Sequence, residues 1–530
     1  MVRSDVHLLD LPNEILLIIF RKLNNVDVLY SLSDINNERL AILAQDKIFT
    51  NILNFLSALT DDIYLIPASI LDRFCSDILP RVHHNVKCLI LDSTSMEKIL
   101  LVADYPYLNQ LKLFNFNQDI CSSYFTDESS FQHISRQQIT DLSLICNEDI
   151  SNISVKTYAK NVYIHLFTFF KNLTHLSIVG LSRDQCQPLS LSDLPSTTFS
   201  SSTLTKLCIS LNTLQDCLSL LDGRLKQLST FIVSVHGREN HPTFGHNMDD
   251  LPNLKCFSLT YNFIKVYDAQ VIPLLRRMSH LKELTLYLSI ENRAVFVDGT
   301  HLYNKILIHM PQLRTFTFYI RTEIDVDNSV HWLSSNDIQQ TFNKLQWQQV
   351  ACIVNYSCGT GICHVFSLPF SFDRLDYIGN TFPHITFNRV TFLKVLDSVH
   401  LKHEFFIRIA RAFPMLKEFM VLNCRSPLWF LDNKTIQLPY NQSHSIVEFP
   451  HLTSLNVRRA DVYYVEQFLH AAKTYLPRLT KLEVDYTSLV TVTDNFTRDA
   501  TRANCAKVKW LILEDILVHS SDVHLYFPSL

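Results

Sequence analysis

The chain has 530 residues, of which 47% are hydrophobic and 18% charged, and its formal net charge is −4. This composition allows several domain cores or one long repeat array, but it contains no basic block typical of nucleic-acid binding and no stretch long enough to cross a membrane. The 13 cysteines follow no regular framework, so the sequence predicts a protein of the cytoplasm or nucleus, with neither a nucleic-acid nor a membrane partner.

The first predicted element is a helix within LPNEILLIIFRKL, residues 11–23. Pro12 and Asn13 followed by Glu14 are typical of a helix start, and the six apolar residues 15–20 cover the whole circumference of a helix. Apolar positions at helical spacing predict two further helices: Leu29, Leu32, Ile35, Leu40 and Leu43. A helical unit of about 40 residues seldom has a sufficient apolar core of its own. One side of the first helix therefore needs to be covered, either by the following repeats or by a separate protein.

The stretch LPNEILLIIFRKLNNVDVLYSLSDINNER resembles the F-box, whose members share Leu-Pro, an acidic residue, an apolar run with Phe and a later Asp-Leu-Leu segment. The Trp that many F-boxes carry further on is absent here. The resemblance implies a three-helix F-box-like domain over residues 5–50 that binds a Skp-type adaptor, followed by a helical linker over 51–84. The adaptor-binding residues that it implies are Leu11, Pro12, Glu14, Ile15, Leu16, Ile19, Phe20, Leu23, Leu29, Leu32 and Ile35.

After residue 85 one short pattern recurs: an apolar residue, two others, an apolar residue, one other and an apolar residue. Copies include LNQLKL from Leu108, LTHLSI from Leu173, LTKLCI from Leu204 and, near the end, VKWLIL from Val508. One copy would mean little, but this recurrence resembles the leucine-rich repeat. Asn or Cys three residues beyond the pattern fits the corner of that repeat, at Asn147, Asn212, Asn262 and Cys424.

Two segments show how a repeat is expected to be built. In EFFIRIARAFPMLKEFMV an amphipathic helix ends before Pro414 and a strand follows, and DVYYVEQFLHAAKTYLPRLTKLEV repeats the arrangement from a cap at Asp461 to Pro477. We therefore predict an α/β fold in which residues 85–530 form an irregular leucine-rich-repeat-like solenoid, with parallel strands inside and helices outside.

The repeat pattern fades over residues 320–388, where β-rich segments around Gly359 and Gly361 predict an inserted β-hairpin. Cys358, Cys363 and His364 lie there without the second pair of ligands that a zinc site needs, so no metal or cofactor is predicted. The sequence also contains no Gly-x-Ser-x-Gly nucleophile elbow and no two carboxylates whose spacing would hold them close together. An intrinsic enzyme activity is therefore not expected.

The F-box resemblance implies a substrate-recognition subunit of an SCF-type, cullin–RING ubiquitin ligase, which reaches the cullin through the adaptor and binds a protein substrate through the repeats. The alternative is a repeat-based scaffold that binds proteins and has no role in ubiquitination. Substrate contacts are expected at outward strand positions, namely Lys255, Ser258, Lys282, Thr285, Arg314, Thr317, Lys417, Asn456, Lys481 and Glu483.

Overall fold

The structure is a computed structural model that describes residues 7–530 apart from several gaps. The gaps are residues 34, 60–61, 127–128, 130–136, 147–161, 181–187, 192–199, 238–250, 327–331, 345–347, 358, 424–444 and 514–520. The chain forms two compact units. Unit 1 comprises residues 1–262, 266–285 and 309–315, and unit 2 comprises residues 263–265, 286–308 and 316–530.

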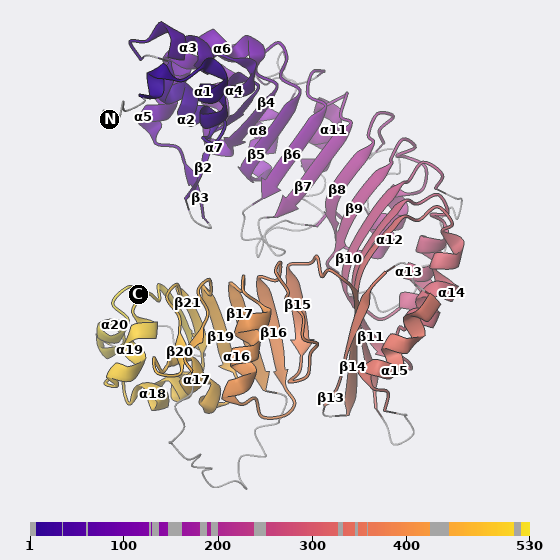
Figure 1. Ribbon diagram of the computed structural model, residues 1–530. Coiled ribbons are helices and arrows are strands. Elements are labelled where there is room, and N and C mark those ends of the chain that lie inside the picture. Colours follow the sequence, from indigo (N-terminus) through magenta and orange to yellow (C-terminus); the bar gives the residue numbers. More distant parts are fainter. Residues whose placement is uncertain are drawn as a thin grey trace, which may run out of the picture. The chain divides into compact units, whose positions relative to one another are not determined.

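Unit 1 begins with a cluster of short helices, drawn in indigo in Figure 1. They are η1 (Leu8–Asp10), α1 (Asn13–Phe20), α2 (Asn25–Leu32), α3 (Glu38–Ala44) and α4 (Lys47–Thr50). The Asn37 side chain accepts a hydrogen bond from Leu40 N and caps α3, and Asp46 does the same for α4 through Ile48 N. The apolar core of this cluster consists of Leu16, Phe20, Val28, Leu40, Leu43, Ala44 and Phe49.

The segment over 51–84, predicted as a helical linker, is helical only in its second half. It starts with β1 (Ile52–Asn54) and the antiparallel pair β2 (Leu56–Leu59) and β3 (Asp62–Leu65). Helical turns follow as α5 (Ala68–Arg73), η2 (Phe74–Ile78), α6 (Leu79–Val82) and η3 (His83–Asn85). Because β1 pairs in parallel with β4, the repeat sheet extends back into the predicted linker.

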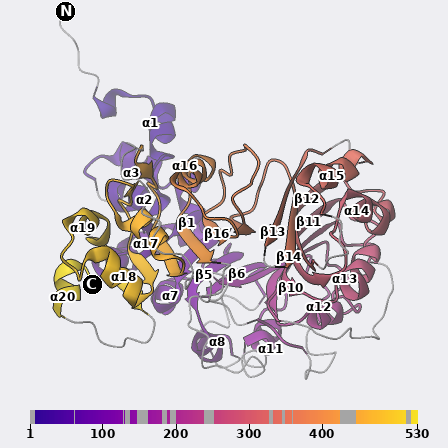
Figure 2. The same ribbon diagram turned by 90° about the horizontal axis from the view of Figure 1, so that it is seen from below.

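The recurring pattern forms a parallel sheet in unit 1. Its strands lie in the order of the sequence: β1, β4 (Cys88–Asp92), β5 (Gln110–Phe116), β6 (Asp141–Cys146), β7 (His175–Gly180), β8 (Lys206–Leu211), β9 (Thr230–Val235) and β10 (Cys256–Ile264). The apolar positions of the pattern are buried in every strand, as Leu207 and Ile209 are in β8. Helices α7 (Ser93–Leu100), α8 (Gln118–Tyr124) and α11 (Ile164–Phe169) lie along one face of these strands (Figure 2). Helices α12 (Leu214–Leu220) and α13 (Tyr267–Arg276) continue the alternation of strand and helix.

The corner positions predicted from Asn are partly correct. Asn212 directly follows β8, and its carbonyl accepts a hydrogen bond from Gly237 N. Asn262 instead lies inside β10, which runs on to Ile264. Asn147 and Cys424 lie outside the described residues.

A ladder of hydroxyl groups joins the starts of successive strands. Thr174 Oγ1 donates to Thr140 O at 3.0 Å, Thr205 Oγ1 to Thr174 O at 3.0 Å, and Ser229 Oγ to Thr205 O at 3.1 Å. Each residue also donates its backbone N–H to the same carbonyl. Unit 2 repeats the contact at Thr453 and Thr480. The ladder gives a physical reason for the Leu-Thr-x-Leu form of many copies of the pattern.

Replacing one rung tests this role. Thr205→Val keeps the side-chain shape and removes the hydroxyl donor, so we expect the free energy of unfolding to fall by about 1 kcal/mol. Thr230→Val, one residue into β9 and outside the ladder, is the matched control. Urea unfolding of both variants measures the difference, and equal losses would show that the hydroxyl contact contributes nothing.

Unit 2 begins with a mixed group of strands, and the boundary between the units falls inside β10, β11 (Glu283–Arg293) and β12 (Thr315–Asp325). β14 (Thr360–Ser367) pairs antiparallel with both β12 and β13 (Val350–Ser357). Gly359 lies in the connection between β13 and β14 with φ +77°. The hairpin predicted around Gly359 is therefore confirmed. Helices α14 (Gly299–Lys305) and α15 (Ser335–Gln340) accompany these strands.

A second parallel sheet of six strands completes unit 2. Its order is β15 (Arg374–Ile378), β16 (Phe392–Asp397), β17 (Glu418–Asn423), β19 (Ser454–Arg459), β21 (Lys481–Val484) and β22 (Trp510–Leu513). The accompanying helices are α16 (His403–Ala412), α17 (Val462–Leu469), α18 (Tyr486–Thr493), α19 (Asp499–Cys505) and α20 (Ser521–Tyr526). One continuous apolar core joins strands and helices, with aromatic contacts such as Phe406–Phe468 at 5.1 Å between ring centroids. The described strands form no closed barrel.

The two helices predicted to end at proline differ in outcome. Helix α16 ends at Ala412, two residues before Pro414, as predicted. Helix α17 is capped by Asp461 as predicted but ends at Leu469, well before Pro477. The missing last turns are replaced by the short strand pair β18 (Val447–Glu448) and β20 (Thr474–Tyr475).

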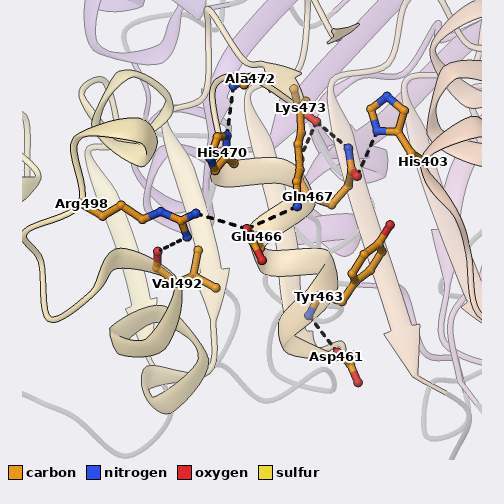
Figure 3. A network of polar contacts seen from close by, with 11 residues as sticks. His403, Asp461, Tyr463, Glu466, Gln467, His470, Ala472, Lys473, Val492 and Arg498 are labelled. Carbon is orange, nitrogen blue, oxygen red and sulfur yellow. Dashed lines mark hydrogen bonds and ion pairs between the residues drawn. The ribbon is translucent and has the colours of Figure 1, made fainter. Parts of the chain in front are cut away.

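Polar contacts explain why α17 stops early (Figure 3). Gln467 bonds His403 Nδ1 at 3.1 Å and donates to Thr474 Oγ1 at 3.1 Å, and Glu466 forms ion pairs with Lys473 and Arg498 at 3.3 Å each. Partial burial acts to raise the pKa of Glu466, but the two cations outweigh it and hold that pKa below its usual value. These contacts fix the chain after Leu469 in a loop, so local helix propensity is overridden there.

Candidate docking surface

Helix α1 buries only one side of its apolar run. Leu16 and Phe20 lie four residues apart and are 0% and 4% exposed, and Phe20 meets Phe49 edge to face with ring centroids 6.4 Å apart. This side of α1 holds the helical cluster together.

The other side of α1 faces outward. Ile15, Ile18 and Ile19 are 41%, 54% and 38% exposed, and Leu23, just after the helix, is 54% exposed. We call these four residues the α1 apolar face. Residues 15, 18 and 19 share one side of a helix, so the six-residue run divides into a buried side and an exposed side. Within the described residues, this flank of the helix is therefore left open.

The adaptor-binding residues implied by the F-box resemblance fall into three groups. Exposed are Pro12, Glu14, Ile15, Ile19, Leu23 and Ile35, and partly exposed are Leu11 and Leu32. Leu16, Phe20 and Leu29 are buried, and no partner can reach them without unfolding the cluster. Leu16 and Phe20 instead hold α1 in place, because both pack in the apolar core of the helical cluster.

Two residues at this surface were missed by the sequence reasoning. Ile18 is more exposed than Ile15 or Ile19, and helical periodicity applied strictly within the run would have placed it beside them. Arg39, the last residue of the F-box-like stretch, was not among the implied binding residues. No short-range sequence signal predicts its role, since its partners lie 26 to 30 residues away.

Arg39 joins α3 to the start of α1. Its Nε donates to Asn13 Oδ1 at 2.7 Å, one terminal nitrogen donates to Leu9 O at 2.8 Å, and the other donates to Leu11 O. The guanidinium thus fixes the backbone directly before α1, where the exposed Leu8 and Leu9 also lie.

Arg39→Met tests this connection, since it keeps the apolar stem and removes the donors. If the α1 apolar face is a docking surface, we expect the variant to bind its partner about ten-fold more weakly because the entry to α1 is no longer fixed. Arg478→Met, an exposed arginine of unit 2, is the control. Calorimetry checks both, and an unchanged affinity for Arg39→Met would exclude a positioning role.

The residues predicted for substrate contact all lie at exposed or partly exposed positions of the strand face. In unit 1, Lys255, Lys282 and Arg314 each directly precede a strand, and Ser258 and Thr285 lie within β10 and β11. In unit 2, Thr317 lies in β12 and Lys417 directly precedes β17. Asn456, Lys481 and Glu483 lie in β19 and β21.

Some of these side chains bond one another. Glu483 accepts from Asn456 Nδ2 at 2.6 Å and pairs with Lys481 Nζ at 2.7 Å, so its charge is partly neutralised within unit 2. Lys282 and Arg314, in contrast, form no ion pair with another described residue. The predicted surface is therefore uneven: internally paired in unit 2 and more basic near the end of unit 1.

The hairpin residues considered for chemistry are packed inside unit 2. Cys363 is 1% exposed and lies 3.8 Å from Cys352 between the sulfur atoms, and burial raises the pKa of its thiol. His364 is fully buried, and its Nδ1 lies 3.0 Å from Tyr319 Oη. Cys358 lies outside the described residues. Across the described chain, no three or more His, Cys, Asp or Glu side chains are grouped as metal ligands.

No protein-family model matches the chain, and no curated protein matches it significantly. Within the described residues, no helix has the length and apolar character to cross a membrane.

Proposed function

We propose that this chain is a substrate-recognition subunit of an SCF-type ubiquitin ligase that acts in the cytoplasm or nucleus. Its N-terminal helices form an F-box-like domain that binds a Skp-type adaptor, and through it a cullin. Its strands and helices form an irregular leucine-rich-repeat-like solenoid that binds a protein substrate. The chain itself carries out no chemistry and supplies proximity between the substrate and the transferring subunits.

The observation that carries the proposal is the α1 apolar face. Four aliphatic side chains between 38% and 54% exposed stand within nine residues, on a helix whose opposite side is a packed core. Contiguous exposed apolar surface of this kind typically marks a protein-interaction site. The same residues stand in register with the Leu-Pro-x-Glu start that resembles the F-box.

The parallel strands support the second half of the proposal. From β4 to β12 successive strands lie side by side in chain order, and the six strands of the second sheet also follow chain order from β15 to β22. Helices alternate with the strands, as expected of stacked repeats that share a core. Such an array presents a long strand face on which outward side chains can contact a partner.

Direct binding to a recombinant Skp-type adaptor tests the proposal. We expect the full chain and the adaptor to form a one-to-one complex in calorimetry and size-exclusion chromatography. A folded chain that shows no binding at micromolar concentrations of adaptor would overturn it. Binding of the adaptor without capture of a cullin would favour the scaffold alternative.

A further inference from the structure

One structural position changes character along the sheet of unit 1. The residue directly before each strand donates its backbone N–H to the carbonyl of the equivalent residue before the preceding strand. From β6 to β9 this position holds Thr140, Thr174, Thr205 and Ser229, which are the hydroxyl ladder described above.

Before the next three strands the same position is basic. Lys255 N donates to Ser229 O, Lys282 N to Lys255 O, and Arg314 N to Lys282 O, each at 2.8 Å. The three residues therefore directly precede successive strands, which lie about 4.8 Å apart. We call Lys255, Lys282 and Arg314 the basic row; all three belong to unit 1.

The fold does not require a cation at the position directly before a strand. Lysine and arginine cannot repeat the short hydroxyl contact to the preceding carbonyl, so each gives up a hydrogen bond that four neighbouring positions make. Lys87 holds the same position before β4, so what distinguishes Lys255, Lys282 and Arg314 is that three cations follow one another before neighbouring strands.

Few acidic groups offset the positive charges of the basic row. Lys282 and Arg314 are exposed, and Lys255 is partly exposed with its ammonium donating to Pro252 O at 2.6 Å. Lys206, the first residue of β8, and Lys226, between α12 and β9, add further positive charge. Glu283 is the one acidic residue among the described residues directly beside the row in sequence.

We propose that the basic row is a docking site for an acidic segment of a protein partner. A line of three cations with long side chains can pair with carboxylates of a chain laid across the strand starts, and such charge complementarity gives specificity and a faster encounter. This inference rests on the proposed function, because it specifies the chemical class of the protein substrate that binds the strand face.

The test uses the full chain and a fluorescent poly-L-glutamate of about 15 residues as the probe. The variant Lys255→Thr/Lys282→Thr/Arg314→Thr installs the hydroxyl residue that the fold uses elsewhere, so folding should be kept. The control Lys87→Thr/Arg478→Thr/Lys509→Thr removes the same charge: Lys87 and Lys509 hold the equivalent position before β4 and β22, and Arg478 is exposed in unit 2.

Fluorescence anisotropy at 50 mM salt should show about ten-fold weaker binding for the basic-row variant and nearly unchanged binding for the control. Wild-type binding should weaken as salt rises to 300 mM. Equal binding by all three proteins, or equal losses in both variants, would overturn the inference. Equally tight binding of a 15-residue oligothymidylate would overturn it too, since the row would then not select a polypeptide. Because this assay contains no adaptor, its result does not depend on whether the chain binds an adaptor.

Discussion

The double substitution Ile18→Asp/Ile19→Asp is expected to weaken binding of a Skp-type adaptor by at least about 100-fold, with the chain still folded. The two side chains are 54% and 38% exposed, so the carboxylates stay in water in the free chain and cost little stability. In the complex, each Ile→Asp substitution would remove roughly 1.5–3 kcal/mol of favourable apolar burial and would bring an unpaired charge into the interface. Together these losses exceed the 2.8 kcal/mol or so that corresponds to 100-fold.

The control for this experiment is Val295→Asp/Ile308→Asp. These residues are 62% and 57% exposed and lie in unit 2, so the change in charge and in exposed apolar surface is matched. We expect the control to bind the adaptor as the wild type does in calorimetry. Equal affinity of the Ile18/Ile19 variant and wild type would show that the α1 apolar face is not where the adaptor docks.

The second large effect is on the pH dependence of stability, through His364. Full burial and the nearby Arg321 guanidinium lower the pKa of His364 to about 3 from an ordinary value of 6.5. Below pH 6.5 the unfolded chain takes up a proton on this imidazole while the folded chain does not. The stability that His364 contributes is therefore present above pH 6.5 and is lost as pH falls from 6.5 towards 3.

His364→Gln should flatten this dependence. The glutamine amide does not titrate, so between pH 6.5 and pH 5 the variant should lose about 1.6 kcal/mol less unfolding free energy than wild type. Urea unfolding at a series of pH values measures the slope. His384→Gln, at a surface position, is the control. A parallel pH profile for His364→Gln and wild type would mean that folding does not change the pKa of His364 and would contradict this account.

The parts of the fold that follow from short-range pattern could be predicted from the sequence. Leu207 and Ile209 are buried because the recurring apolar spacing places them on one face of a parallel strand, and this holds along both sheets. The hairpin around Gly359 followed from glycine and β-rich flanks. The end of α17 could not be predicted, because Gln467, Thr474 and Asn504 meet only in the folded chain.

The candidate docking surface was predicted in outline and not in detail. The apolar run 15–20 indicated that one side of α1 needs covering, but the sequence does not reveal which residues pack against Phe49. Leu16 and Phe20 were therefore grouped with the outward residues, and Ile18 was left out. The Arg39 contacts depend on tertiary proximity and leave no local pattern.

The basic row shows the same limit on the strand face. Lys255, Lys282 and Arg314 were identified as outward positions from alternation alone, whereas their alignment on successive strands appears only from the backbone hydrogen bonds that connect them. The hydroxyl ladder beside them is likewise visible only once the register is known.

The most direct test of the proposed function is cullin capture from purified components. The full chain, immobilised by an affinity tag, is incubated with a Skp-type adaptor and a cullin, with and without the adaptor. The account predicts that cullin is retained in stoichiometric amount only when the adaptor is present, and that Ile18→Asp/Ile19→Asp abolishes retention. Retention of adaptor without cullin, or of cullin by the Ile18/Ile19 variant, would contradict it.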